Sequence, residues 1–252
     1  MSRTRLVAGN WKMNKTPQET EAYIRAFLPR LDLGRGIEIL LIPPFPSLER
    51  AAASLGSAEV LLGAQDLHYE ARGAYTGAVS AEMLRGSGCQ FVLVGHSERR
   101  HVFGDTDEVV CRKLTAALEG NLHAILCVGE TLEQRTAGDT SSVLNRQLES
   151  ALAERAVSDV GLSIAYEPVW AIGTGETATP DQAQEAVAEI RGWLADAFGP
   201  SVAEATRVLY GGSVKPENVK ELIEQPDIDG GLVGGSSLDP ETFARIVEGA
   251  MP

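Results

Sequence analysis

Short apolar segments alternate with longer segments of helical pattern along the whole chain, and this repeat restricts the fold more than any other feature. Each apolar segment ends in Gly, Pro or polar residues, as the buried strands of a parallel sheet do. The alternation therefore predicts a series of βα units. Eight segments qualify as strands: Leu6 to Asn10, Glu38 to Ile42, Val60 to Gln65, Phe91 to Gly95, His123 to Val128, Ser163 to Tyr166, Arg207 to Tyr210 and Gly231 to Val233.

The length of the repeat favours a closed barrel over an open sheet. Eight units in 252 residues leave about 31 residues for each, which is the usual size of one βα unit. Helix starts are marked by Thr16-Pro17, Thr179-Pro180 and Asp239-Pro240, where a capping side chain precedes a proline. No linker or low-complexity segment interrupts the pattern. We expect an α/β fold, an eight-stranded parallel (β/α)8 barrel, as a single domain over residues 1–252.

Charge and composition exclude several classes of function. The 35 acidic residues exceed the 22 Lys and Arg residues, and a net charge of -13 repels nucleic acids. No apolar run approaches the roughly 18 residues that a membrane helix needs, and the N-terminus lacks the apolar core of a secretory signal. The three widely spaced cysteines, Cys89, Cys111 and Cys127, fit a reducing compartment and form no metal knuckle. We expect a cytoplasmic protein that binds neither nucleic acid nor membrane.

Titratable residues follow three of the predicted strands. The first strand leads into Asn10 and Lys12, the fourth into His96, and the sixth into Glu167. Each residue by itself is more often structural, but a parallel barrel gathers the carboxyl ends of its strands at one rim. A carboxylate can remove a carbon-bound proton, an imidazole can polarise a carbonyl, and an ammonium can offset negative charge. This combination favours proton abstraction next to a carbonyl group.

Glycine pairs follow the last two predicted strands. Gly211-Gly212-Ser213 and Gly234-Gly235-Ser236 resemble the loops that bind phosphate through backbone N–H groups in parallel barrels. Either pair alone fits an ordinary turn equally well. Their occurrence after strands seven and eight together predicts a ligand that carries a phosphate ester.

One further glycine motif suggests a nicotinamide-dependent oxidoreductase. The segment Gly173 to Ala178 matches the spacing G-x-G-x-x-A, but that fingerprint must join a strand directly to a helix. Here the strand ends near Tyr166 and the helix signal begins only at Thr179. The segment Pro168 to Ala178 is better interpreted as a mobile lid, with glycines that supply its flexibility.

Four motifs together resemble the triosephosphate isomerase family: GNWKMN at residues 9–14, VGHSERR at 94–100, AYEPVWAIGTG at 165–175 and YGGSV at 210–214. They occur in the order and at the spacing of the family, and the likeness covers essentially the whole chain. The resemblance implies a TIM barrel that interconverts dihydroxyacetone phosphate and D-glyceraldehyde 3-phosphate through an enediolate, in glycolysis and gluconeogenesis. It also implies that neither a metal nor an organic cofactor takes part.

The resemblance assigns catalytic roles to five residues of this chain. Glu167 matches the base that moves the proton between two carbons, and His96 matches the neutral imidazole that donates to the substrate oxygens. Lys12 and Asn10 would stabilise the oxyanion and the phosphate. Glu98 matches the residue that supports the lysine.

The resemblance also places the phosphate, mostly on backbone N–H groups. The matching positions are Gly173, Ser213, Leu232, Gly234 and Gly235. In the family the lid closes over the substrate and protects the enediolate from losing its phosphate. Trp170 and Tyr210 match the residues that hold the lid open and closed.

A homodimer follows from the same resemblance. The segment Gln65 to Gly77 resembles the loop that each subunit inserts beside its partner's active site, which would bring Thr76 near the neighbour's catalytic residues. Two departures stand out. Ala78 replaces a glutamate that faces a partner-subunit arginine, matched here by Arg99, and Glu176 replaces a lysine at the far hinge of the lid.

Two other functions remain open at this level. A non-catalytic barrel that binds a phosphate ligand could keep the same fold. Another phosphosugar enzyme would share the glycine loops without needing Asn10, Lys12, His96 and Glu167 together. Sustained turnover of substrate would exclude the first, and inhibition by a planar enediolate mimic would count against the second.

Overall fold

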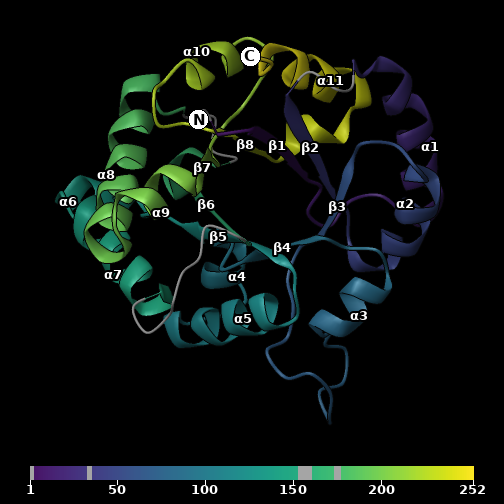
Figure 1. The fold of residues 1–252 in the computed structure, drawn as a ribbon, viewed down its shortest axis with the longest axis horizontal. Helices are drawn as coiled ribbons and strands as arrows, with labels where there is room; N and C mark the ends of the chain where they lie inside the picture. The colour runs from purple at the N-terminus through teal and green to yellow at the C-terminus, as the bar shows by residue number, and fades with distance from the viewer. Residues whose placement is uncertain (1–2, 33–35, 153–160, 173–176) are drawn as a thin grey trace.

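Eight parallel strands form a closed barrel in chain order, and this confirms the expected fold class (Figure 1). The computed structural model describes residues 3–32, 36–152, 161–172 and 177–252. Each strand pairs with the next, and the last pairs with the first. The strands are β1 (Arg5–Asn10), β2 (Ile37–Ile42), β3 (Leu61–Ala64), β4 (Phe91–Val94), β5 (His123–Val128), β6 (Leu162–Tyr166), β7 (Arg207–Tyr210) and β8 (Gly230–Val233). The third strand is shorter at both ends than the expected segment Val60 to Gln65.

Helices surround the barrel (Figure 1). They are α1 (Pro17–Phe27), α2 (Leu48–Leu55), α3 (Ala81–Gly86), α4 (Ser97–His101), α5 (Asp107–Glu119), α6 (Leu132–Ala137), α7 (Thr140–Leu152), α8 (Pro180–Phe198), α9 (Pro200–Ala205), α10 (Val219–Ile223) and α11 (Pro240–Gly249). The helix starts expected at Thr16, Thr179 and Asp239 are confirmed, because each of these side chains accepts a hydrogen bond from the first turn. Short 3-10 turns cover Leu28–Arg30, Phe45–Ser47, Val169–Ala171 and Gly235–Leu238.

The core has two layers because each strand buries both of its faces. In β1, Leu6 and Ala8 point into a cluster that fills the barrel, whereas Val7 packs with the surrounding helices. This alternation explains why the strands appear in the sequence as continuous apolar runs. Each fully buried Val, Leu, Ile or Phe side chain contributes roughly 1.5–3 kcal/mol to folding.

Gly230 permits the barrel to close. Its φ angle of 154° is one that other residues rarely adopt. A Cβ atom at this position would lie 1.8 Å from the carbonyl oxygen of Leu6 on the neighbouring strand. Only glycine therefore allows β8 to approach β1 closely enough for pairing.

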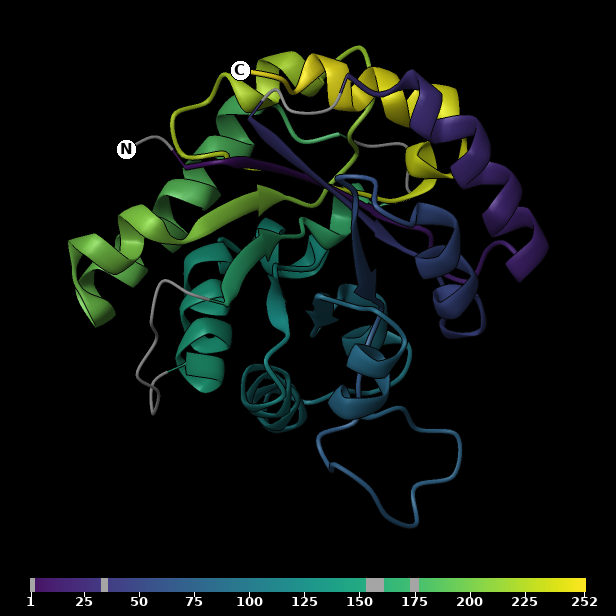
Figure 2. The same cartoon turned by 45° about the vertical axis from the view of Figure 1, so that its right-hand side comes forward.

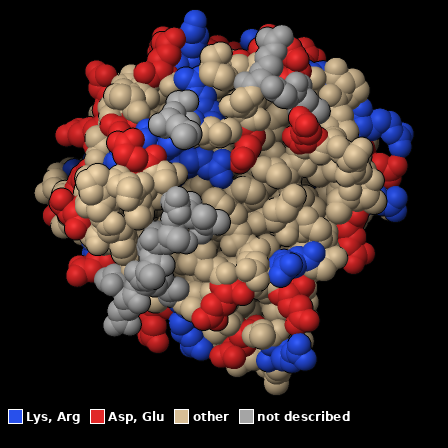
Figure 3. Space-filling view, viewed as in Figure 1, with Lys and Arg blue, Asp and Glu red and all other residues tan. Residues whose placement is uncertain are grey.

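The surface carries charges of both signs. Acidic and basic side chains are spread around the edge of the face seen in Figure 3. Among the described residues, no helix combines the length and the apolar character needed to cross a membrane. The loop Gln65 to Gly77, called the arm below, extends away from the barrel between β3 and α3 (Figure 2).

Candidate active site

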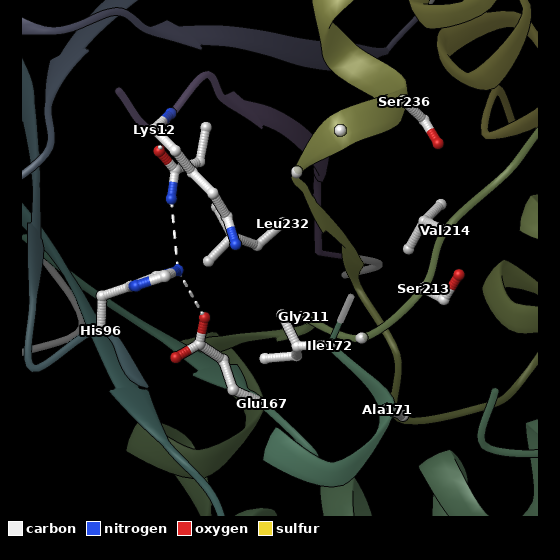
Figure 4. Close-up of a pocket in the computed structure, with 14 residues that line it drawn as sticks. Lys12, His96, Glu167, Ala171, Ile172, Gly211, Ser213, Val214, Leu232 and Ser236 are labelled. Atoms are coloured by element: carbon white, nitrogen blue, oxygen red, sulfur yellow. Dashed lines mark hydrogen bonds and ion pairs between the residues drawn. The ribbon is translucent and has the colours of Figure 1, made fainter. Parts of the chain in front are cut away.

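The polar residues that follow separate strands meet in one pocket, as the barrel topology requires. Asn10 is the last residue of β1, His96 caps the start of α4 after β4, and Glu167 directly follows β6. Together with Lys12 they line a pocket of about 370 Å³. In Figure 4 the side chains of Lys12, His96 and Glu167 point toward one another.

Hydrogen bonds fix the orientation of the His96 ring and of the Asn10 amide. The backbone N–H of Glu98 donates to His96 Nδ1 at 3.2 Å, which assigns the ring proton of the neutral imidazole to Nε2. The Asn10 Oδ1 atom accepts from the Lys12 N–H at 3.0 Å, so the Nδ2 group faces His96 Nε2 at 3.2 Å. Two N–H donors thus converge on one region, where a ligand oxygen could accept from both.

Glu167 is held in a resting position at the edge of this region. Its Oε1 atom lies 3.0 Å from His96 Nε2, and its Oε2 atom accepts from the Ser97 N–H at 2.8 Å. Burial opposes ionisation, but His96 and the Ser97 N–H outweigh it and lower the pKa of Glu167. The residue is therefore a carboxylate at neutral pH.

The protonation of His96 depends on the position of that carboxylate. Burial lowers the pKa of His96, whereas the nearby Glu167 charge raises it, and in the resting state the net shift is upward. The Glu167 carboxylate is the largest cause of the upward shift. Burial and the Glu98 N–H bond to Nδ1 act in the other direction, and both favour the neutral ring that donates through Nε2.

Lys12 has a left-handed backbone conformation, with a φ angle of 53°. This conformation is uncommon for a residue other than glycine and costs about 1–2 kcal/mol. The Gln65 side chain stabilises it by donating to the Lys12 carbonyl at 2.8 Å. The Lys12 ammonium donates to Glu98 Oε1 at 2.7 Å. Gln65 was not among the expected site residues, although it also follows a strand.

The glycine loops line the opposite side of the pocket. Lys12 spans the two sides, since its Cε atom lies 3.4 Å from where a Cβ of Gly234 would be. Gly173 lies outside the described residues, as do residues 174–176 of the expected lid. Among the described residues, no three His, Cys, Asp or Glu side chains are grouped so that they could hold a metal ion. The lining residues on this side include Gly211, Gly212, Ser213, Leu232, Gly234, Gly235 and Ser236.

A second buried carboxylate lies next to the site, and the expected set of residues missed it. Glu130 is fully buried, and its Oε1 atom accepts from the Tyr166 hydroxyl at 3.0 Å and from Trp170 Nε1 at 2.9 Å. Arg135 donates to the same oxygen at 3.2 Å. These contacts fix the segment that begins the expected lid. Glu130 follows β5, so examining every strand end would have found it.

Comparison with known proteins agrees with this geometry. The family model described as Triosephosphate isomerase matches residues 5–250. The triosephosphate isomerase of Carboxydothermus hydrogenoformans is 49% identical over 246 residues, which are 97% of this chain and 98% of that protein. The enzyme of Symbiobacterium thermophilum is 50% identical over 98% of this chain and 97% of its own length. The enzyme of Aquifex aeolicus is 51% identical over 96% and 98% of the two chains.

Proposed function

The chain belongs to the triosephosphate isomerase family, and we propose that Glu167, His96, Lys12 and Asn10 carry out the isomerisation. The reaction interconverts dihydroxyacetone phosphate and D-glyceraldehyde 3-phosphate. The observation that carries the assignment is the convergence of one carboxylate and three N–H donors on a single pocket. A base and an oxyanion site are what proton transfer next to a carbonyl needs.

In the first half of the reaction, the Glu167 carboxylate removes a proton from the carbon next to the substrate carbonyl. The electron pair of the broken C–H bond forms a C=C bond, and the carbonyl π electrons move to the oxygen. His96 Nε2 and Asn10 Nδ2, 3.2 Å apart, donate to that oxygen, and the Lys12 ammonium offsets its negative charge.

In the second half, Glu167 delivers a proton to the carbon that carried the original carbonyl, and the C=C electron pair forms the new C–H bond. The new carbonyl forms on the carbon that lost its proton, as the hydroxyl there gives up its proton. A proton must also pass from one substrate oxygen to the other. His96 is placed to relay it, because Nε2 faces the pocket while Nδ1 stays engaged by the Glu98 N–H. In this proposal the base and the N–H donors come from the chain itself, and the proton transfer needs neither a hydride carrier nor an electron sink.

The phosphate group lies on the glycine-rich side in this proposal. The positions that would bind it are Gly173, Ser213, Leu232, Gly234 and Gly235, mostly through backbone N–H groups. The glycine loops after β7 and β8 line the same pocket as the catalytic side chains, which supports this placement. Barrels of this kind commonly bind phosphate at these two loops.

The test is an assay of purified, metal-stripped protein with D-glyceraldehyde 3-phosphate, following the formation of dihydroxyacetone phosphate. Fast turnover without added cofactor is expected. The variant Glu167→Ala should keep most of its affinity for phosphate esters but lose a factor of about 10² to 10⁴ in turnover, the range for a positioned base. Undiminished turnover in this variant would refute the assignment of Glu167.

We further propose a homodimer in which the arm inserts beside the active site of a second copy. The arm is preorganised for binding, because the His68 ring packs against the rings of Tyr69 and Tyr75, with ring centroids 4.3 Å from each. The exposed apolar side chains of Val102 and Phe103, which follow α4, offer a surface for it. Light scattering at working concentration should give twice the chain mass, and a monomer mass would contradict the proposal.

The loss of a glutamate at Ala78 does not leave Arg99 without partners. Arg99 lies 3.2 Å from Asp66 and 3.3 Å from Asp105 of the same chain, and its guanidinium stacks on Phe103 at 4.4 Å. The arginine is therefore neutralised within one subunit. This supports a dimer that does not depend on an ion pair at position 78.

We also propose that residues 1–252 form one domain and that the protein acts in the cytoplasm. The match to the family model over residues 5–250 and the closure of β8 on β1 support one domain. The bacterial relatives named as triosephosphate isomerases support a location where triose phosphates are available. A single cooperative unfolding transition and recovery in the cytoplasmic fraction would be the expected results.

A further inference from the structure

Arg100 connects two strand ends beneath the active site without lining the substrate pocket. Its Nε donates to the Gly95 carbonyl at 2.8 Å, and Nη2 donates to the Cys127 carbonyl at 3.4 Å. These carbonyls lie just after β4 and near the end of β5. Nη1 pairs with Asp107 at 2.6 Å, and the arginine side chain is only 9% exposed. One buried guanidinium thus joins the ends of two adjacent strands to the first residue of α5.

The helix that carries Arg100 also supplies three contacts of the active site. Helix α4 has five residues, too few to be stable by itself, so its orientation depends on its anchors. Its Ser97 N–H holds Glu167, its Glu98 N–H holds His96, and the Glu98 carboxylate holds Lys12. Any rotation of this short helix changes all three contacts at once.

The anchor acts on the residue at which the turn into α4 begins. Gly95 has a φ angle of 71°, and a Cβ there would lie 3.0 Å from Arg100 Nη2. The guanidinium therefore packs directly against the peptide that precedes His96. Gly95, Ser97, Arg100 and Glu167 surround one narrow gap on this side of the site, which is too small to hold a water molecule. The arginine and the carboxylate thus share one small space behind the substrate pocket.

We propose that Arg100 is a positioning residue for the isomerisation: it fixes the turn from Gly95 into α4 and so sets the resting position of Glu167. The inference rests on the proposed role of Glu167 as the base. Arg100 touches neither the substrate pocket nor the reacting atoms and acts through the Ser97 N–H. A lysine cannot replace it, because a single ammonium cannot reach two carbonyls and a carboxylate in the fixed geometry of a guanidinium.

The test compares Arg100→Lys with a matched control, Arg191→Lys. Arg191 is also buried, with 10% of its side chain exposed, and it also joins backbone carbonyls to carboxylates. It donates to the carbonyls of Ala203, Thr206 and Asp227 and to the carboxylates of Asp227 and Asp229. It lines no part of the pocket. Three quantities are measured for each variant: kcat and KM, the thermal unfolding temperature, and the pH titration of the Glu167 carboxyl by ¹³C NMR.

The proposal predicts different patterns for the two variants. Arg100→Lys should lower kcat about tenfold with KM within about twofold, since a small displacement of the base affects mainly the chemical step. Its Glu167 carboxyl should titrate at higher pH than in the wild type, because the Ser97 N–H bond that favours the carboxylate is weakened. Arg191→Lys should lower the unfolding temperature but leave kcat and the titration unchanged.

Wild-type kcat and an unshifted Glu167 titration in Arg100→Lys would overturn the proposal, whatever the loss of stability. If this variant does not fold, Asp107→Asn should produce a smaller decrease in kcat and a smaller shift of the same sign. No change in a folded Asp107→Asn protein would then count against the role of Arg100. The failure of the proposed function is distinguishable, because it would appear as full turnover in Glu167→Gln with Arg100 intact.

Discussion

Replacing Lys113 with methionine should remove the centre of a buried ionic cluster at the root of the arm. The Lys113 side chain is 5% exposed, and its ammonium lies 2.7 and 2.8 Å from the two oxygens of Asp66 and 2.6 Å from Asp105. Asp66 belongs to the arm, whereas Lys113 belongs to α5. The cluster therefore joins the arm to the barrel's helical layer.

The structure allows the cost of Lys113→Met to be estimated. Removing one partner of a buried ion pair typically costs roughly 3–5 kcal/mol, because the other charge is left buried. Here Arg99 still lies 3.2 Å from Asp66 and 3.3 Å from Asp105, so the lower end applies, about 3 kcal/mol. With a urea dependence of about 3 kcal/mol per molar, the unfolding midpoint should fall by about 1 M.

The loss should depend on pH in a defined direction. Burial raises the pKa of Asp66, and the Lys113 charge partly offsets this rise. Lys113→Met removes the offset, so the pKa of Asp66 rises further. When the pKa of a carboxyl is higher in the folded than in the unfolded state, the folded state binds the proton more tightly. The free energy of unfolding then rises as the pH falls. The deficit of Lys113→Met should therefore be largest at pH 7 and smaller at pH 5.

Urea unfolding at fixed protein concentration measures this deficit. The control is Lys220→Met, which alters a lysine that is 77% exposed and lies 4.0 Å from Glu224. That change should shift the free energy of unfolding by less than about 0.5 kcal/mol. A loss below about 1 kcal/mol for Lys113→Met, or an equal loss at pH 5 and pH 7, would refute the reasoning.

Two further predictions concern the buried His123 and the glycine loop after β7. Burial lowers the pKa of His123 to about 4. The free energy of unfolding should therefore fall as the pH drops from about 6.5 towards 4, because the unfolded chain binds the proton first. Urea titrations of His123→Gln should show a flatter pH dependence of this free energy, and an unchanged dependence would contradict the prediction. In Gly212→Ala the new Cβ would lie 2.2 Å from the hydroxyl oxygen of Tyr210, so the loop after β7 must shift and kcat/KM should fall by about tenfold or more. Gly192→Ala, where the Cβ meets open space, should leave kcat/KM unchanged, and equal values for the two variants would argue against this account.

The parts of this molecule that follow from the sequence are those encoded locally. Strands buried on both faces appear as apolar runs, and caps such as Thr16 and Thr179 mark helix starts within four residues. The joint site of Asn10, His96 and Glu167 also follows, because barrel closure brings every strand's carboxyl end to one rim.

Side-chain contacts between residues far apart in the sequence leave no local pattern from which they could be predicted. The bond from Trp170 to Glu130 joins residues 40 positions apart, and the bond from Arg100 to the Cys127 carbonyl spans 27 positions. Their partners depend on how loops pack after the barrel closes. Arg99 is a further example. The resemblance to the family indicated that Ala78 removes the glutamate that would pair with this arginine across the dimer, whereas the structure shows two carboxylates of the same chain beside it.

The most direct test of the central claim is to run the isomerisation of D-glyceraldehyde 3-phosphate in D₂O and measure deuterium in the product by NMR. If Glu167 carries the proton and exchanges it with solvent, the dihydroxyacetone phosphate formed should contain deuterium on the carbon that receives the proton. Turnover should collapse in Glu167→Gln. Product free of deuterium, together with full activity in Glu167→Gln, would indicate direct hydrogen transfer between the carbons. That result would contradict the mechanism.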